Sequence, residues 1–255
     1  MINYIKDEIT VILSLWKREN YVQQLEYIIN QRKKPYQIWI YQNESHLNID
    51  IPEDIKQKYN ISIIQSKDMN FKFYGRFTIA LLCETEYVAV FDDDTIPGNR
   101  WLENCINTSK KYNCIVGANG RTLDTDLSSE TPLKTHYVKG IGDGATVSKD
   151  TQVSFVGHCW FLKTEWIKNL WKDPPFTWDN GEDIHLAASC KIYDGIECFV
   201  PQMPNDDRSL WGDMYPQLGG DEHASWKRDN HNVLRYKIIK HWHSKGWNPV
   251  GLQTP

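Results

Sequence analysis

Residues 88–98 read VAVFDDDTIPG, an apolar run that ends in three aspartates and a Pro-Gly turn. Such a run, bounded by polar residues, predicts a buried strand. Adjacent carboxylates repel one another unless a cation or a proton offsets their charge. Oxygen ligands suit Mg²⁺ or Mn²⁺, and Mg²⁺ often combines one or two carboxylates with substrate phosphates. The D-x-D spacing of Asp92 and Asp94 therefore indicates a site for a metal and a diphosphate. A solvated acidic loop is the alternative.

Strands and helices alternate on both sides of this stretch. We predict strands over residues 9–15, 36–41, 61–64, 87–91 and 114–118, and helices over residues 21–32, 73–83 and 99–112. This alternation implies βαβ units and a largely parallel sheet. Because ligands of such sheets bind outside the carboxyl ends of the strands, the position of the aspartates after the fourth strand also indicates a site.

The second half of the chain is less regular. Residues 119–152 are rich in Gly, Thr, Ser and Asp, and we expect a long excursion there. Strands are predicted over 154–162 and 196–200, helices over 164–171, 184–192 and 225–243, and a loop over 201–222. We expect a single domain over residues 1–255, with a nucleotide-binding half at about 8–120 and an acceptor-binding half at about 121–245.

The composition excludes several classes of protein. The net charge of −4 provides no general attraction for nucleic acid or anionic lipid. No stretch approaches the ~18 apolar residues that a membrane span needs. The apolar run at residues 9–15 follows Asp7 and Glu8, so it is interpreted as a strand and not as a signal peptide. The six cysteines form no C-x-x-C pair, which argues against a zinc ribbon and favours buried thiols. We expect a cytoplasmic protein.

A second acidic stretch is WDNGEDIHLAAS, residues 178–189. Glu182 and Asp183 are predicted at the first turn of an amphipathic helix, where the helix dipole favours carboxylates. The alternative is purely structural, with Asn180 or Asp183 serving as the N-cap.

Two enzyme classes place D-x-D after an apolar strand. In phosphotransferases of the haloacid-dehalogenase type the motif sits on the first strand, whereas here it follows the fourth. Residues 178–189 also lack the apolar lead and the second Asp of the later motif of that family. The order of motifs therefore disfavours such a phosphatase. A non-catalytic carbohydrate-binding relative is a further alternative, which the eleven tryptophans alone would permit.

The other class is the glycosyltransferases of the GT-A fold, and the chain resembles their family 2 over roughly residues 8–120 and 150–200. Four motifs carry the resemblance, in the order of the family: ITVILSLWKREN (9–20), IYQNES (40–45), YGRFTIALLCETEYVAVFDDD (74–94) and NGEDIHLA (180–187). It implies a GT-A-like, Rossmann-like α/β fold, with a mostly parallel sheet flanked by helices and a smaller acceptor-side region. There is one departure: Asn43 stands where the family usually has Asp.

The resemblance also implies a reaction and a donor site. A sugar would move from a nucleoside-diphosphate sugar to a hydroxyl of a glycan or glycoconjugate, with Mn²⁺ or Mg²⁺. The E-D motif is compatible with inversion, and retention is the alternative, because some retaining GT-A enzymes carry a similar acidic pair. Trp16 would lie against the nucleobase, and Asn43 would bond to the base. Arg76 would approach the base or the diphosphate. Asp92 would bind the ribose or a metal-bound water, and Asp94 would bind the metal.

The remaining roles that the resemblance implies concern the acceptor side and Asp93. Asp183 would take the proton of the acceptor hydroxyl, beside Glu182 as an acceptor-binding residue. Asp93 belongs to the donor-binding set, although on an extended backbone it points the other way, as a bystander or a cap. Trp160 and Trp178 are candidates for contact with the acceptor sugar.

A C-terminal histidine completes the metal site in some GT-A enzymes. His241 and His243, in HWHSKGW, and His223 are the candidates here. On one helix, His241 and His243 point about 200° apart, so both cannot join one site. The identity of the donor, that of the acceptor and the oligomeric state cannot be inferred from the sequence.

Overall fold

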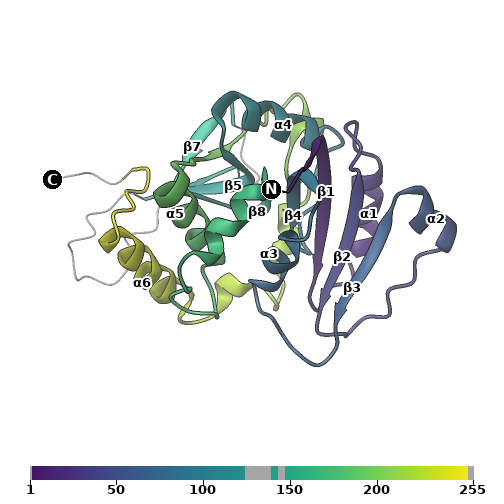
Figure 1. Cartoon of the computed structure of the whole chain (residues 1–255), viewed down its shortest axis with the longest axis horizontal. Coiled ribbons are helices and arrows are strands. Elements are labelled where there is room, and N and C mark those ends of the chain that lie inside the picture. The colour runs from purple at the N-terminus through teal and green to yellow at the C-terminus, as the bar shows by residue number, and fades with distance from the viewer. Residues whose placement is uncertain (1, 124–138, 143–146, 252–255) are drawn as a thin grey trace.

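The computed structural model describes residues 2–123, 139–142 and 147–251, and over these residues nine strands form one sheet (Figure 1). The strand order is β3-β2-β1-β4-β8-β5-β9-β7, and β6 pairs with β5 outside this path. The predicted α/β fold with a mostly parallel sheet flanked by helices is confirmed, although the sheet is mixed.

The first half of the chain forms the parallel part. Its strands are β1 (Ile5–Leu15), β2 (Gln37–Asn43), β3 (Ile61–Ser66) and β4 (Thr85–Phe91), and its helices are α1 (Tyr21–Ile29), α2 (Glu53–Lys58) and α3 (Gly75–Ala80). β1 pairs in parallel with both β2 and β4. Val11, Ile12 and Leu13 are completely buried, as expected where both faces of a parallel sheet are covered. All these strands therefore end at the same edge.

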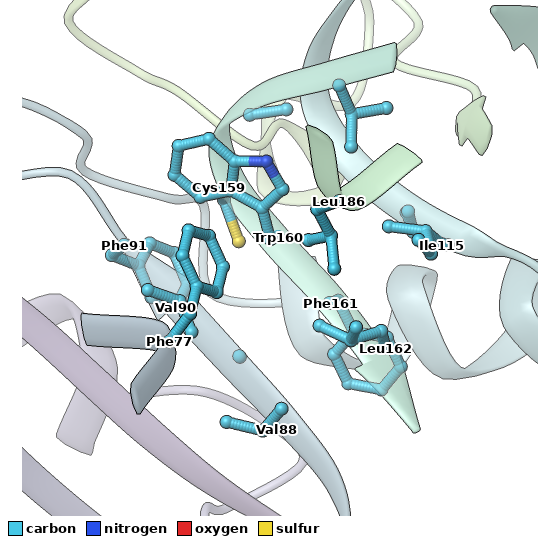
Figure 2. Packing of buried hydrophobic residues seen from close by; sticks show 14 of the residues in the cluster. Phe77, Val88, Val90, Phe91, Ile115, Cys159, Trp160, Phe161, Leu162 and Leu186 are labelled. Carbon is cyan, nitrogen blue, oxygen red and sulfur yellow. The ribbon is translucent and has the colours of Figure 1, made fainter. Parts of the chain in front are cut away.

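One strand of the second half runs against this direction. β8 (Phe155–Lys163) lies between β4 and β5 (Ile115–Thr122) and is antiparallel to both. The core continues across this join, because Phe77 of α3, residues of β4, and Trp160, Phe161 and Leu162 of β8 pack together (Figure 2). The other elements of this half are β6 (Lys139–Ile141), β7 (Thr151–Val153), β9 (Cys198–Val200), α4 (Trp101–Tyr112), α5 (Glu182–Asp194) and α6 (His231–Ser244).

Several predicted elements differ from the structure. The helix predicted over residues 164–171 is a 3-10 helix, η1 (Thr164–Trp171), and the helix predicted over 225–243 divides into η4 (Ser225–Lys227) and α6. The loop at 201–222 contains the short 3-10 helices η2 (Arg208–Leu210) and η3 (Pro216–Gly220). α2 was not predicted, because it buries no residue and so shows no apolar period. Part of the predicted excursion at 119–152 lies outside the described residues, but β5 extends into it, β6 lies within it and β7 begins at its end.

The structure confirms the expectation of buried thiols. All six cysteines are buried and free of disulfides. In the part of the chain that the structure describes, no helix has both the length and the apolar character to span a membrane.

Candidate active site

A cavity of about 780 Å³ opens where β1, β2 and β4 end and α5 begins. Of the ten site residues predicted from the sequence, the cavity is lined by nine, and Trp178 lies outside the lining. The nine are Trp16, Asn43, Arg76, Asp92, Asp93, Asp94, Trp160, Glu182 and Asp183. The structure therefore brings residues from four separate sequence motifs to one place.

The three aspartates after β4 point to different partners. Asp92 accepts a hydrogen bond from Arg76 Nη1. Asp93 accepts one from the backbone N–H of Trp16 (3.1 Å) and pairs with Arg18. Asp94 Oδ2 lies 3.0 Å from Arg18 Nη1. Burial raises the pKa of Asp93 to about 7 against the influence of Arg18, and burial together with the charge of Asp92 raises the pKa of Asp94.

These carboxylates suit a hard divalent cation in chemistry. Asp92 and Asp94 are oxygen ligands in a concentration of negative charge that a cation would relieve. Among residues 2–123, 139–142 and 147–251, no group of three or more His, Cys, Asp or Glu is arranged to hold a metal. Water and the phosphates of a substrate would have to supply the remaining ligands, which is the coordination that Mg²⁺ favours.

Arg76 connects the D-x-D motif with the E-D motif. Its guanidinium is buried; Nη1 bonds to Asp92 and Nη2 bonds to Glu182 Oε1 at 2.7 Å. Burial and the neighbouring Asp183 raise the pKa of Glu182 to about 7, although Arg76 and Arg235 oppose this shift. A single cation thus links two acidic motifs that are about ninety residues apart in the sequence.

Asp183 lies in the first turn of α5 and forms a bidentate ion pair with Arg235. Arg235 Nη1 lies 2.9 Å from Oδ1, and Arg235 Nη2 lies 2.6 Å from Oδ2. The backbone N–H of Ile184 also donates to Oδ1, at 2.8 Å. Of the two oxygens, Oδ2 accepts fewer of these bonds and so has the greater remaining capacity to accept a further hydrogen bond.

The capping alternative for this segment is not what the structure shows. The N-cap of α5 is Gly181, which has no side chain to make a capping bond, and Asp183 in the first turn accepts a backbone hydrogen bond only from the N–H of the next residue, Ile184. Gly181 has φ +80°, and a Cβ there would lie 2.3 Å from Ile238 Cδ1. Asn180 instead bonds to Arg235 and His231. The glycine of N-G-E-D therefore lets α5 begin against α6 with both carboxylates in the cavity.

The turns after β1 and β2 form the other end of the cavity. Trp16 Nε1 donates to Glu44 Oε2 at 3.0 Å. Asn43 Nδ2 donates to Asn70 Oδ1 at 2.9 Å and to the carbonyl of Lys72 at 3.2 Å. Asn43 Oδ1 accepts from the N–H of Phe71 at 2.9 Å. The side-chain amide of Asn43 therefore holds residues 70–72 through both its nitrogen and its oxygen.

These contacts explain the departure from the usual aspartate at this position. We expect Asn43→Asp to lower the free energy of unfolding by about 1–3 kcal/mol, because the new carboxylate cannot donate and would face two carbonyl oxygens. Urea unfolding measures the change. Asn48→Asp, at an exposed position in the loop that follows β2, is the control. Equal stability of the two variants would contradict the structural role of Asn43.

The predicted acceptor tryptophans lie in different surroundings. Trp160 is only 2% exposed, with Arg76 Cζ 4.4 Å from its ring centroid and the ring of Phe77 edge-on at 5.4 Å. It is therefore packed under Arg76. Trp178 is 52% exposed and packs edge-on against Tyr74 at 5.1 Å. Trp226, which was not predicted, is 59% exposed and lines the cavity.

Of the three histidines considered for the metal site, His223 lines the cavity, with its ring centroid 6.3 Å from that of Trp16. His241 packs on Phe176, and the ring of His243 bonds to the carbonyl of Trp247, so neither lines the cavity.

Sequence reasoning missed His158, Arg18, Asp221 and Arg235. His158 lines the cavity with a left-handed backbone (φ +64°). Burial opposes its protonation, but Asp213 at 3.7 Å and the charge of Asp94 raise the pKa of His158 to about 9. Arg18 falls in the first motif, WKREN, which could have drawn attention to it. Asp221 and Arg235 carry no local signal, since their partners are distant in the sequence.

The family model described as "Glycosyl transferase family 2" matches residues 10–171, more than half of the chain. No curated protein matches the chain. A solved structure described as "Crystal structure of S. aureus TarS 1-349" is similar at 14% sequence identity and a TM-score of 0.48. That similarity covers 78% of this chain and 61% of the TarS chain.

Proposed function

The chain belongs to glycosyl transferase family 2 and is a glycosyltransferase, and we propose that it moves a sugar from a nucleoside-diphosphate sugar to a hydroxyl of a glycan. We further propose that the reaction depends on Mn²⁺ or Mg²⁺ and inverts the anomeric centre. Neither the family match nor the sheet supports the alternative of a phosphatase.

One observation carries this proposal. Arg76 bonds to Asp92 at one end and to Glu182 at the other, so the D-x-D and E-D motifs line a single cavity. A diphosphate needs a cationic site, and an acceptor hydroxyl needs a base. The cavity offers carboxylates suited to a metal on one side and a carboxylate suited to a base on the other.

The donor is proposed to lie along the ends of the parallel strands. Its base would rest near Trp16 and Asn43, and its diphosphate near Asp92 and Asp94, with Arg76 close to both. Asp94 and Asp92 would hold the cation, which when bound supplies Lewis acidity toward the departing diphosphate. Asp93 is committed to Trp16 and Arg18, which fits a role in shaping the turn beneath the donor.

The acceptor is proposed to approach from the side of α5. Asp183 would take the proton of the attacking hydroxyl as the new bond to the anomeric carbon forms and the bond to the diphosphate breaks on the opposite face. Of the two carboxylate oxygens of Asp183, Oδ2 accepts fewer hydrogen bonds and is proposed to receive the proton. Glu182, whose Oε1 bonds to Arg76, would accept a further hydroxyl of the acceptor through its other oxygen.

Exposed aromatic rings near this entrance suit a sugar acceptor. Trp226 on the lining and Trp178, which adjoins the lining residue Asp179, present apolar faces on which a sugar ring can stack. Because Trp160 is covered by Arg76, we propose that it supports Arg76 and does not stack on the acceptor. In this proposal residues 8–120 bind the donor, and residues 121–245 bind the acceptor and also close over the donor site.

A binding experiment tests the proposed metal site. We expect Asp94→Ala to weaken binding of uridine or guanosine diphosphate in the presence of Mn²⁺ by at least ~10-fold, because a metal ligand is lost. Calorimetry with and without Mn²⁺ measures this change. Asp206→Ala, an exposed aspartate outside the cavity, is the matched control. The metal role of Asp94 fails if the two variants bind the nucleotide equally well with Mn²⁺ present.

A further inference from the structure

Arg18 is bonded to three carboxylates from two distant parts of the chain. Its Nη1 pairs with Asp93 and lies 3.0 Å from Asp94 Oδ2. Its Nε and Nη2 donate to the two oxygens of Asp221, at 2.6 and 2.7 Å. Arg18 and Asp221 are 203 residues apart in the sequence. The side chains of Arg18, Asp93 and Asp94 are 10%, 10% and 14% exposed, so these contacts are largely shielded from water, whereas the side chain of Asp221 is 37% exposed.

Residues 215–228, which include Asp221, cover the D-x-D motif, and this segment is called the strap below. Three contacts hold the strap to the donor half. Tyr215 shares a hydroxyl hydrogen bond with Tyr27 at 2.9 Å, His223 packs against Trp16, and Asp221 pairs with Arg18. Gly219 approaches Asp94 so closely that a Cβ at that position would lie 3.1 Å from Oδ2.

The charges of the three aspartates after β4 determine the role of Arg18. Asp93 and Asp94 would repel each other and Asp92 if nothing offset their charge, and Arg18 is the cation that contacts both. Asp94 Oδ2, which faces Arg18, belongs to the residue proposed as the metal ligand. A divalent cation at Asp94 and a guanidinium on the same carboxylate would repel each other strongly at this separation.

We propose that Arg18 is a resident counter-cation that competes with the divalent cation for Asp94, and that Asp221 is the anchor that retains it. The inference rests on the proposed function. When the divalent cation takes Asp94, Nη1 leaves that carboxylate, while Nε and Nη2 stay on Asp221. Arg18 thus remains beside Asp93, and the strap remains in place over the donor.

Substitutions of Arg18 and Asp221 should change the affinity for Mn²⁺ in opposite directions. Arg18→Met removes a positive charge that competes for Asp94, so we expect the protein to bind Mn²⁺ about tenfold more tightly. Asp221→Asn removes a negative charge and leaves Arg18 with Asp93 and Asp94 alone, so we expect binding about threefold weaker. Calorimetric titration with Mn²⁺ alone, without any nucleotide, measures both changes.

Two further variants separate charge from structure. Arg18→Lys keeps the charge but not the forked geometry, and should bind Mn²⁺ nearly as the wild type does. Arg100→Met breaks another ion pair between distant segments, Arg100 with Asp207 at 3.0 Å, outside the cavity. It should leave Mn²⁺ affinity unchanged. Thermal unfolding shows whether each variant is folded. If Arg18→Met does not fold, Asp221→Asn still decides, because tighter Mn²⁺ binding by that variant overturns the proposal.

The outcomes distinguish this inference from the proposed function. If Asp94→Ala abolishes Mn²⁺ binding but Arg18→Met binds Mn²⁺ no more tightly than the wild type, the competition is refuted and the metal site stands. If Mn²⁺ binding is the same with and without Asp94, the proposed metal site fails and the competition fails with it.

Discussion

Asp183→Asn is expected to lower the rate of sugar transfer by about 10²–10⁴-fold while the affinity for the donor stays unchanged. The substitution removes the oxygen proposed to take the proton of the acceptor and keeps the size of the side chain. Asn retains Oδ1 as acceptor for the N–H of Ile184 and for Arg235 Nη1. Its amide nitrogen would face Arg235 Nη2, so a loss of stability of about 1–3 kcal/mol accompanies the loss of rate.

Single-turnover transfer with saturating donor, together with calorimetry of the nucleoside diphosphate, separates these effects. Glu197→Gln, at a carboxylate that follows the other end of α5 and pairs with Lys191, is the control and should transfer sugar at the wild-type rate. Transfer by Asp183→Asn at nearly that rate would mean that Asp183 serves only to pair with Arg235. A loss of donor binding would mean that Asp183 belongs to the donor side of the cavity.

Arg76→Met is expected to lower the free energy of unfolding by about 3–5 kcal/mol, because it leaves a buried carboxylate without its partner. Glu182 is 6% exposed, lies next to Asp183 and receives Arg76 Nη2 at 2.7 Å. Asp92 loses its bond to Nη1 in the same variant. Chemical unfolding measures the change. Lys110→Met, which breaks the exposed pair with Asp7, should change stability little.

The pH dependence of this effect has a definite sign. In the folded protein the pKa of Glu182 is about 7, raised from 4.5, chiefly by burial. A group whose pKa is raised by folding supports the fold at acid pH, and this support is lost as the pH rises through the folded value. Since Arg76 opposes the shift, its loss should raise the pKa of Glu182 further. We expect the destabilisation by Arg76→Met to be larger at pH 8 than at pH 5, and a loss that grows toward acid pH would contradict this assignment.

Local patterns predicted the features of the site that lie on regular elements. The apolar run before Asp92 and the alternation of strands and helices placed the aspartates at the carboxyl edge of β4. The period of residues 184–192 placed Glu182 and Asp183 at the start of α5. Such signals depend only on residues that are close in the sequence. Because each motif is short and local, its position on a strand or a helix could be predicted.

Contacts between distant segments have no such signal. Asp183 with Arg235 and Arg18 with Asp221 are pairs that arise only when α6 packs against α5 and the strap covers the D-x-D motif. The strand β8 was predicted from its apolar run, but its antiparallel direction was not, because a run of apolar residues does not specify the direction of pairing. Likewise, the number of tryptophans does not indicate that the ring of Trp160 lies under Arg76.

The most direct test is a crystal structure of the Asp183→Asn variant with Mn²⁺ and an intact nucleoside-diphosphate sugar. We predict the base near Trp16, the cation on Asp94, and the side chain of residue 183 on the face of the anomeric carbon opposite the diphosphate. A diphosphate bound away from Asp92 and Asp94, or lying on the same side of the sugar as residue 183, would contradict the proposed reaction.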